Sequence, residues 1–229
     1  MSIQFREGTE ADAGAVTSVF TDSFSDDAIN QRVFPANSKQ SQANVKEWLG
    51  AGLKDPHSRY MLAINDSLTG DDAVVALAKW VAPSAPPKAP EAADWPSKTD
   101  WPEGADAALG VEFFGTLEKK HKEHMGARPH WYLELLAVRK SYHGKGLGKQ
   151  LLNWGLERAD QDGVEAYLQA SPAGAPLYRK CGFEDIESYH VSKVDYTEIF
   201  MKKTAPAKAR RFPVRSHRID VDSLSKQIL

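Results

Sequence analysis

Glycines alternate with other residues at positions 144, 146 and 148, soon after a strand-like run that ends at Val138. A long stretch with helical apolar periodicity starts at the same place. The first amides of a helix have no internal acceptor and lie at the positive end of its dipole, and glycine lets an anion approach the backbone closely. Further donors or charges around this junction come from His143, Lys145 and Lys149. The pattern favours phosphate binding.

The spacing excludes two common phosphate loops. A nucleoside-triphosphate loop needs GxxxxGK followed by Ser or Thr, but here Lys149 is followed by Gln150. The dinucleotide fingerprint GxGxxG follows a first strand, whereas this junction comes late in the chain and has no acid placed for a ribose. An ordinary tight turn that needs glycine for its backbone angles remains the alternative.

The elements that must position this junction follow from residue periodicity. Before it, we expect a strand at 3–6, a helix capped by Thr9 and Asp12, a helix from Ser38 to Pro56, a hairpin of 60–64 and 73–81, and a helix from about 109 to Gly126. Around and after it, we expect a strand at 131–138, a helix to about 160, a strand at 164–170, a short helix at 175–180, and a closing pair at 183–191 and 196–201.

Two segments fall outside this framework. Residues 82–108 are rich in proline and contain the repeated tripeptides 94–96 and 100–102 (Asp-Trp-Pro), which predicts a loop inserted into the domain. Residues 204–229 form a basic tail, for which a solvated tail is favoured over a nuclear-import or anion-binding role.

The run from Leu136 to Leu152 (LAVRKSYHGKGLGKQLL) resembles the acyl-CoA signature of the GNAT superfamily of N-acetyltransferases. That signature is Gln or Arg, two residues, Gly, one residue, then Gly or Ala, and it aligns on His143, Gly146 and Gly148. A second family feature follows at the expected distance, a tyrosine-bearing helix at Tyr178 followed by Gly-Phe at 182–183. Two departures are His143 in place of Gln or Arg and Ser171 in place of the usual Asn.

The resemblance implies an α/β fold, a single domain over residues 1–203 with a central mixed, V-split sheet flanked by helices. It implies acetyl-CoA as co-substrate, held between two splayed strands, and no metal. A bulge in the first strand would aim amides at the cofactor. The cofactor residues that it implies are Leu136, Ala137, Val138, His143, Gly144, Lys145, Gly146, Leu147, Gly148, Lys149 and Ser171.

The resemblance also assigns catalytic roles. Tyr178 would serve as the acid near the leaving thiolate, with a plain core tyrosine as the alternative. Glu134 could take a proton from the attacking amine, or it could be a solvated acid or one paired with Lys or Arg, and the two interpretations are about even. His190 and Tyr189 are expected beside the acceptor cleft.

Three other groups have weaker signals. The rings expected either to cover the cleft or only to pin the insert are Trp95, Trp101, Phe113 and Phe114. His121 and His124 lie on one helix, where a solvated face is favoured over a metal site. Cys181 is expected to be a small packed residue rather than a nucleophile.

Composition narrows the function classes. The chain has 229 residues, 29 Lys and Arg against 31 Asp and Glu, and one Cys, so a disulfide framework and a polybasic coat are excluded. No apolar run reaches the roughly 18 residues of a membrane span, so no membrane partner is expected. We expect a cytoplasmic protein, with nuclear entry through the tail left open, and we leave oligomerisation open.

The family resemblance implies an acetyltransferase, and we expect it to move an acetyl group from acetyl-CoA to the primary amine of a small molecule by direct attack in a ternary complex. Three alternatives stay open. They are a non-catalytic acyl-CoA-binding module, an acetyltransferase of protein lysines or N-termini, and a nucleic-acid-associated protein that uses the basic tail. The near-neutral net charge of the chain makes nucleic acid an unfavoured partner.

Overall fold

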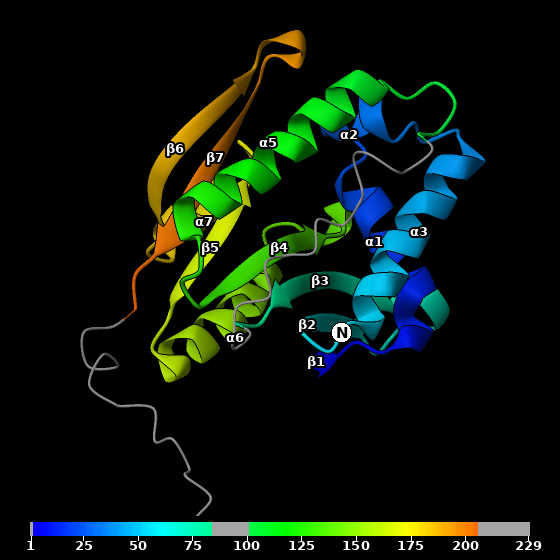
Figure 1. Cartoon of the computed structure of the whole chain (residues 1–229). Coiled ribbons are helices and arrows are strands. Elements are labelled where there is room, and N and C mark those ends of the chain that lie inside the picture. Colours follow the sequence, from blue (N-terminus) through cyan, green and yellow to red (C-terminus); the bar gives the residue numbers. More distant parts are fainter. Residues whose placement is uncertain (1, 84–100, 206–229) are drawn as a thin grey trace, which may run out of the picture.

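The computed structural model describes residues 2–83 and 101–205, which build one mixed sheet with helices on both faces (Figure 1). The strands lie in the order β1-β2-β3-β4-β5-β7-β6. Neighbours pair antiparallel, except that β4 and β5 pair in parallel. The strands are β1 (Ile3–Glu7), β2 (Ser58–Asn65), β3 (Val74–Val81), β4 (His130–Val138), β5 (Glu165–Ala170), β6 (Glu184–Val191) and β7 (Tyr196–Lys203). The predicted fold class is confirmed.

The helices divide between the two faces of the sheet (Figure 1). One apolar cluster joins one face to α1 (Ala13–Ser23), α2 (Ala28–Val33), α3 (Lys39–Lys54) and α5 (Ala107–Met125). A second cluster joins the other face to α6 (Leu147–Asp162) and α7 (Ala175–Lys180). None of the helices within 2–83 and 101–205 is both long enough and apolar enough to cross a membrane.

Strand β4 carries a bulge at Glu134. Lys79 of β3 pairs with Leu135, and Trp80 pairs with Leu133, so Glu134 is the extra residue. The extra residue inverts the alternation of side chains, because Leu133 packs in the α6 cluster whereas Leu135 packs in the opposite cluster. The bulge implied by the family resemblance is therefore present.

The same region holds the split in the sheet. Strands β4 and β5 pair from His130 to Leu133, opposite Glu165 to Leu168, and their pairing ends there. Beyond that point β4 continues to Val138 alongside β3 only. The parting strands leave a gap at the centre of the sheet, as a V-split requires.

The observed elements differ from the predicted ones in a few places. Helix α2 was not predicted, since its six residues are too few to show a helical period. Asp27 caps it by accepting a hydrogen bond from the Asn30 amide at 2.8 Å. Helix α5 begins at Ala107, inside the predicted insert. Residues 84–100, with Trp95, and residues 206–229 of the tail lie outside the described residues.

Candidate active site

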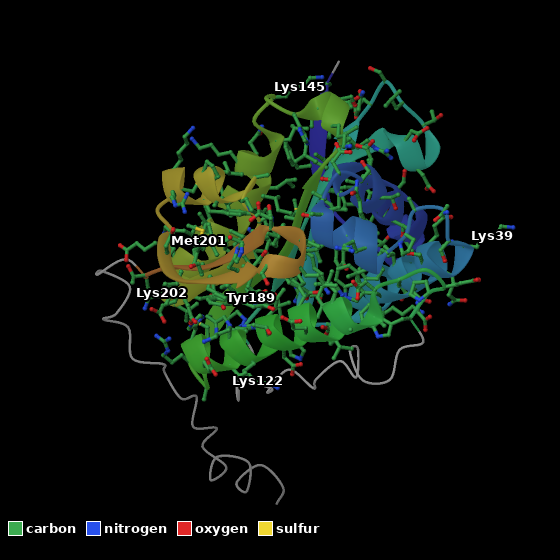
Figure 2. All side chains as sticks on the ribbon, turned by 90° about the horizontal axis from the view of Figure 1, so that it is seen from above. Lys39, Lys122, Lys145, Tyr189, Met201 and Lys202 are labelled. Atoms are coloured by element: carbon green, nitrogen blue, oxygen red, sulfur yellow. The ribbon has the colours of Figure 1, made fainter. Side chains whose placement is uncertain are left out.

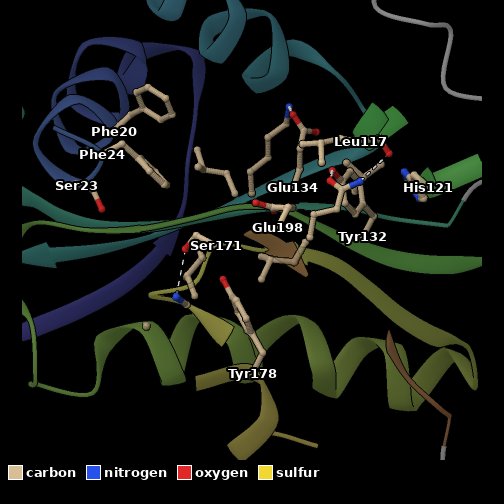
Figure 3. Close-up of a pocket in the computed structure, with 18 of the residues that line it drawn as sticks. Phe20, Ser23, Phe24, Leu117, His121, Tyr132, Glu134, Ser171, Tyr178 and Glu198 are labelled. Carbon is tan, nitrogen blue, oxygen red and sulfur yellow. Dashed lines mark hydrogen bonds and ion pairs between the residues drawn. The ribbon is translucent and has the colours of Figure 1, made fainter. Parts of the chain in front are cut away.

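A cavity of about 1750 Å³ opens where β4 and β5 part. At one end it is bounded by the start of α6, and at the other by the aromatic face of α5. Figure 3 shows that side chains from helices and strands far apart in the sequence converge on it. Because the cavity spans both sides of the split sheet, two ligands can enter it from opposite faces and meet at its centre.

The start of α6 has the backbone geometry of an anion site. Gly144 and Gly146 have φ angles of 74° and 78°, in the left-handed region that favours glycine, and no atom lies within 4 Å of a Cβ placed on either. Within the described residues, the amides of 144–149 have no backbone acceptor. Gly148 is different, because its Cβ position would lie 3.5 Å from Leu177 and 3.6 Å from Val138, so it lies at a packed contact.

The side chains around this site are partly engaged. The Nε2 atom of His143 donates to the carbonyl of Val138 at 2.9 Å, and its amide donates to the carbonyl of Lys140 at 3.1 Å. Only the other ring nitrogen of His143, Nδ1, is therefore left for the predicted contact with a phosphate. The Lys145 ammonium lies 4.3 Å from the centre of the Tyr142 ring, and Lys149 lines the cavity.

The free edge of β4 lines the cavity with Leu136 and Val138, whereas Ala137 is buried against the opposite cluster. The Val138 amide, predicted to contact the pantetheine arm, donates to the Ser23 hydroxyl at 3.2 Å. Ser171, at the end of β5, lines the cavity and accepts a hydrogen bond from the Gly174 amide at 3.2 Å. Its hydroxyl hydrogen stays available for a ligand.

Tyr178 projects from α7 into the cavity (Figure 3). The residue is 8% exposed, and its hydroxyl has no hydrogen-bond partner among the described residues. Burial, followed by the charge of Glu198, raises its pKa well above the usual value for tyrosine. The phenol is thus a protonated donor without an acceptor, directed at the centre of the cavity.

Glu134, the bulged residue, forms an ion pair with Lys79. The Lys79 ammonium lies 2.6 Å from a carboxylate oxygen of Glu134, and their side chains are 6% and 23% exposed. Lys79 also lies over the rings of Trp48 and Tyr60, at 5.4 and 5.9 Å from their centres. Of the two interpretations of Glu134, the structure therefore shows the paired acid.

A second acid lies in the cavity that we did not predict. Glu198 of β7 is 5% exposed and lines the cavity, as does Tyr196 of the same strand. Burial, with the nearby charge of Asp27, raises the pKa of Glu198 to about 7. Burial also raises the pKa of Asp27, which lines the same cavity. A carboxylate with a pKa near neutrality is suited to proton transfer.

A comparison with protein-family models identifies the family of the chain. The model of the Acetyltransferase (GNAT) family matches residues 28–183, which is more than half of the chain and includes β4, the glycine junction and Tyr178. The chain belongs to the GNAT acetyltransferase family.

Relatives agree with this assignment over shorter stretches. An acetyltransferase from Stachybotrys chartarum is 36% identical over 74 residues, which is 32% of this chain and 32% of that protein. A probable acyltransferase, SID5, from Ajellomyces capsulatus is 34% identical over 55 residues, 24% of this chain and 40% of that protein. The matched stretches thus span less than half of the length of these curated relatives.

Solved structures share the GNAT fold. An arylalkylamine N-acetyltransferase 2 from Aedes aegypti superposes with a TM-score of 0.67 at 15% identity, and covers 90% of this chain and 100% of its own. A structure from Corynebacterium glutamicum described as histone acetyltransferase HPA2 and related acetyltransferase gives 0.60 at 21% identity, with 93% and 99% coverage. At these identities the likeness extends to the fold.

Several aromatic residues of this GNAT domain lie where expected and others do not. Phe113 and Phe114 line the cavity from α5. Trp101 packs on Gly110, where a Cβ would lie 2.3 Å from the ring, so it pins the chain to α5 instead of covering the cleft. Tyr189 is not among the cavity residues, since it stacks on Phe113 and donates to Glu112 of α5 at 2.8 Å (Figure 2).

Other expectations concern residues outside the centre of the cavity. His190 is exposed and bonds Thr197 at 3.1 Å, away from the cavity lining. Cys181 is half-buried against the α6 cluster, and burial raises its pKa, so the predicted packed residue is confirmed.

The prediction of a solvated face for His121 and His124 was wrong. His121 stacks on Tyr167 with ring centres 4.7 Å apart, and its Nε2 lies 2.7 Å from Nε2 of His130. Burial lowers its pKa to about 3, so it is neutral. His124 bonds the Tyr167 hydroxyl at 3.1 Å. Among residues 2–83 and 101–205, no group of three or more His, Cys, Asp or Glu could hold a metal ion.

Glu198 was not predicted because it belongs to no recognised motif. One signal for it was nevertheless present in the sequence. Tyr196, Glu198 and Phe200 alternate along β7 and are all buried, so Glu198 is an acid on an otherwise apolar strand face. Such a residue needs a buried partner or a function.

Proposed function

We propose that this protein transfers the acetyl group of acetyl-CoA to the primary amine of a small molecule that carries an aromatic or other apolar body. One observation carries the proposal. A single cavity joins the open amides at the start of α6 to a chamber lined by aromatic rings and carboxyls, and the Tyr178 phenol points into this cavity (Figure 3).

The donor end fits the phosphates and the arm of acetyl-CoA. In the part of the chain that the structure describes, the amides of 144–149 have no backbone acceptor, and no atom lies within 4 Å of a Cβ placed on Gly144 or Gly146. Lys145 and Lys149 add charge that complements a diphosphate. Leu136 and Ser171, one from each parting strand, would flank the pantetheine arm. When bound, acetyl-CoA supplies the activated acetyl group as a thioester.

Tyr178 is suited to assist the leaving group. Its raised pKa keeps the phenol protonated at neutral pH. A protonated donor that lines the cavity and has no acceptor among the described residues can direct its hydrogen bond to a developing thiolate. An amide of the β4 edge beyond the bulge, other than that of Val138, which donates to Ser23, would polarise the thioester carbonyl.

The acceptor end favours an amine with an apolar body. The aromatic side chains that line it are Phe20, Phe24, Phe34, Trp48, Phe113 and Phe114. Rings of this kind bury apolar surface and attract cations. The acids in the same chamber, Asp27 and Glu198, complement an ammonium group, whereas the charge of Glu134 is already balanced by Lys79.

The test is a thiol-release assay with the full chain and acetyl-CoA. Candidate acceptors are arylalkylamines, polyamines, amino acids, and peptides with a free N-terminus or an internal lysine. We expect arylalkylamines to give the highest kcat/KM. Fast turnover confined to peptides would replace the small-molecule assignment by a protein acetyltransferase. Release no faster than background with every acceptor, from protein that binds acetyl-CoA, would refute the catalytic assignment.

A further inference from the structure

Two carboxyls and a phenol line the same cavity: Asp27, which caps α2, and Tyr196 and Glu198 of β7. Glu198 and Tyr196 are 5% and 8% exposed, and Asp27 is half-buried. Burial and the charge of Asp27 raise the pKa of Glu198 to about 7, so this carboxyl holds a proton below neutral pH. The two acids offer negative charge that an ammonium group can neutralise.

We propose that Asp27, Tyr196 and Glu198 form the ammonium-binding end of the acceptor site, and that Glu198 takes the proton of the acceptor amine. The inference rests on the proposed function and names the group that recognises its substrate. Independent support comes from Tyr178, whose hydroxyl is directed into the same cavity from the other side and has no hydrogen-bond partner among the described residues (Figure 3). The acceptor nitrogen would lie between these two sides.

The proton step is balanced. One N–H bond of the ammonium breaks and its electron pair stays on nitrogen, which becomes a nucleophilic amine. One O–H bond forms on Glu198, so the positive and negative charges cancel. The proton returns to solvent from Glu198 after the product leaves. Glu134 is less suited to this step, because its carboxylate is held by Lys79 at 2.6 Å.

The titratable groups that face Glu198 keep their charge near neutral pH, whereas Glu198 titrates there. The phenols that face it come from β4, β5, α7 and β6, and all have raised pKa values: Tyr132, Tyr167, Tyr178 and Tyr189. On α5, burial holds the pKa of His121 at about 3. None of these groups changes charge between about pH 6 and pH 8.

The experiment measures proton release when 2-phenylethylamine binds the full chain without acetyl-CoA, by calorimetry in buffers of different ionisation enthalpy. An entering ammonium favours the charged form of Glu198 and displaces the proton that this carboxyl holds. With a pKa of about 7 for Glu198, we expect about 0.9, 0.5 and 0.1 protons released at pH values of about 6, 7 and 8. The uncharged 2-phenylethanol should bind at least about tenfold more weakly and release none.

Three variants separate proton transfer from a structural role. Glu198→Gln should abolish the release. Asp27→Asn keeps the helix cap, because Asn also caps, but it removes the charge that raises the pKa of Glu198, so the profile should move to lower pH. Tyr196→Phe removes the hydroxyl whose interaction with Glu198 lowers this pKa, so the profile should move to higher pH. A loss of packing would not move the two profiles in opposite directions.

Glu184→Gln is the matched control, an exposed carboxyl on β6 that should leave the release unchanged. Melting curves establish that each variant is folded. Release that persists in folded Glu198→Gln, shifts in the same direction for Asp27→Asn and Tyr196→Phe, or no binding of the amine by the folded native chain would each overturn the proposal. If the amine binds with the expected release but no thiol is freed from acetyl-CoA, the proposed acetyl transfer is wrong and the ammonium site stands.

Discussion

The contact between α6 and β3 depends on the absence of a side chain at Gly155. A Cβ placed there would lie 2.1, 2.4 and 2.5 Å from three ring atoms of Trp80, whereas ordinary carbon contacts are about 3.5–4 Å. Trp80 is fully buried, and its Nε1 donates to the carbonyl of Leu151 at 3.4 Å. The ring cannot turn away, so Gly155→Ala must displace α6 or the strand by more than about 1 Å.

The expected cost follows from two opposing effects. Overpacking a core costs about 1–3 kcal/mol, and the three close contacts place this site at the upper end. The helix propensity of Ala returns about 1 kcal/mol. We therefore expect a net loss of about 2 kcal/mol, or about 4–8 °C in Tm for a domain of this size. Because α6 presents the open amides of its first turn, affinity for CoA should also fall.

The matched control is Gly115→Ala on α5, where no atom lies within 4 Å of the added Cβ. That variant gains the higher helix propensity of Ala without a steric clash, so it should be more stable than the native chain by about 1 kcal/mol. Urea unfolding of both variants and the native chain gives the two free energies, and calorimetry gives the affinity for CoA. The packing argument requires Gly155→Ala to lower the free energy of unfolding and Gly115→Ala to raise it. A Gly155→Ala variant at least as stable as the native chain would therefore refute it.

Three further predictions concern the site and the pH dependence of stability. Tyr178→Phe should lower kcat for thiol release by about 100-fold with little change in the free energy of unfolding, because the lost hydroxyl has no partner among the described residues; an unchanged kcat would remove Tyr178 from catalysis. Gly146→Asp should weaken CoA binding by at least about tenfold, because it adds a negative charge and strains a φ of 78°; undiminished binding by folded protein would contradict the phosphate site. The Arg6 guanidinium lowers the pKa of Asp12 to about 2, so this pair stabilises the fold above about pH 4 and the effect is lost as the pH falls towards 2. Asp12→Asn should therefore cost about 1–2 kcal/mol in urea unfolding at neutral pH, and a difference that persists at about pH 2 would argue against the ion pair.

Local patterns in the sequence were sufficient for the donor half of the site. The strand before the junction, the glycines at 144 and 146, and the helix that follows depend on dihedral preferences and periodicity within a few residues of each other. The same is true of the helix that carries Tyr178 and its end at Gly182, where φ is 89°. These elements were predicted because each is specified by its own neighbourhood.

The acceptor half depends on contacts that no local pattern encodes. Asp27 and Glu198 line one cavity only because α2 and β7 meet at the split sheet, and Lys79 reaches Glu134 only because β3 pairs beside the bulge. Burial in those contacts raises the pKa of one carboxyl and leaves the other paired with an ammonium. Sequence alone therefore determined which segment is built to bind a phosphate, while the tertiary structure decided which acid is poised to accept a proton, since desolvation and charge pairing exist only after distant segments pack.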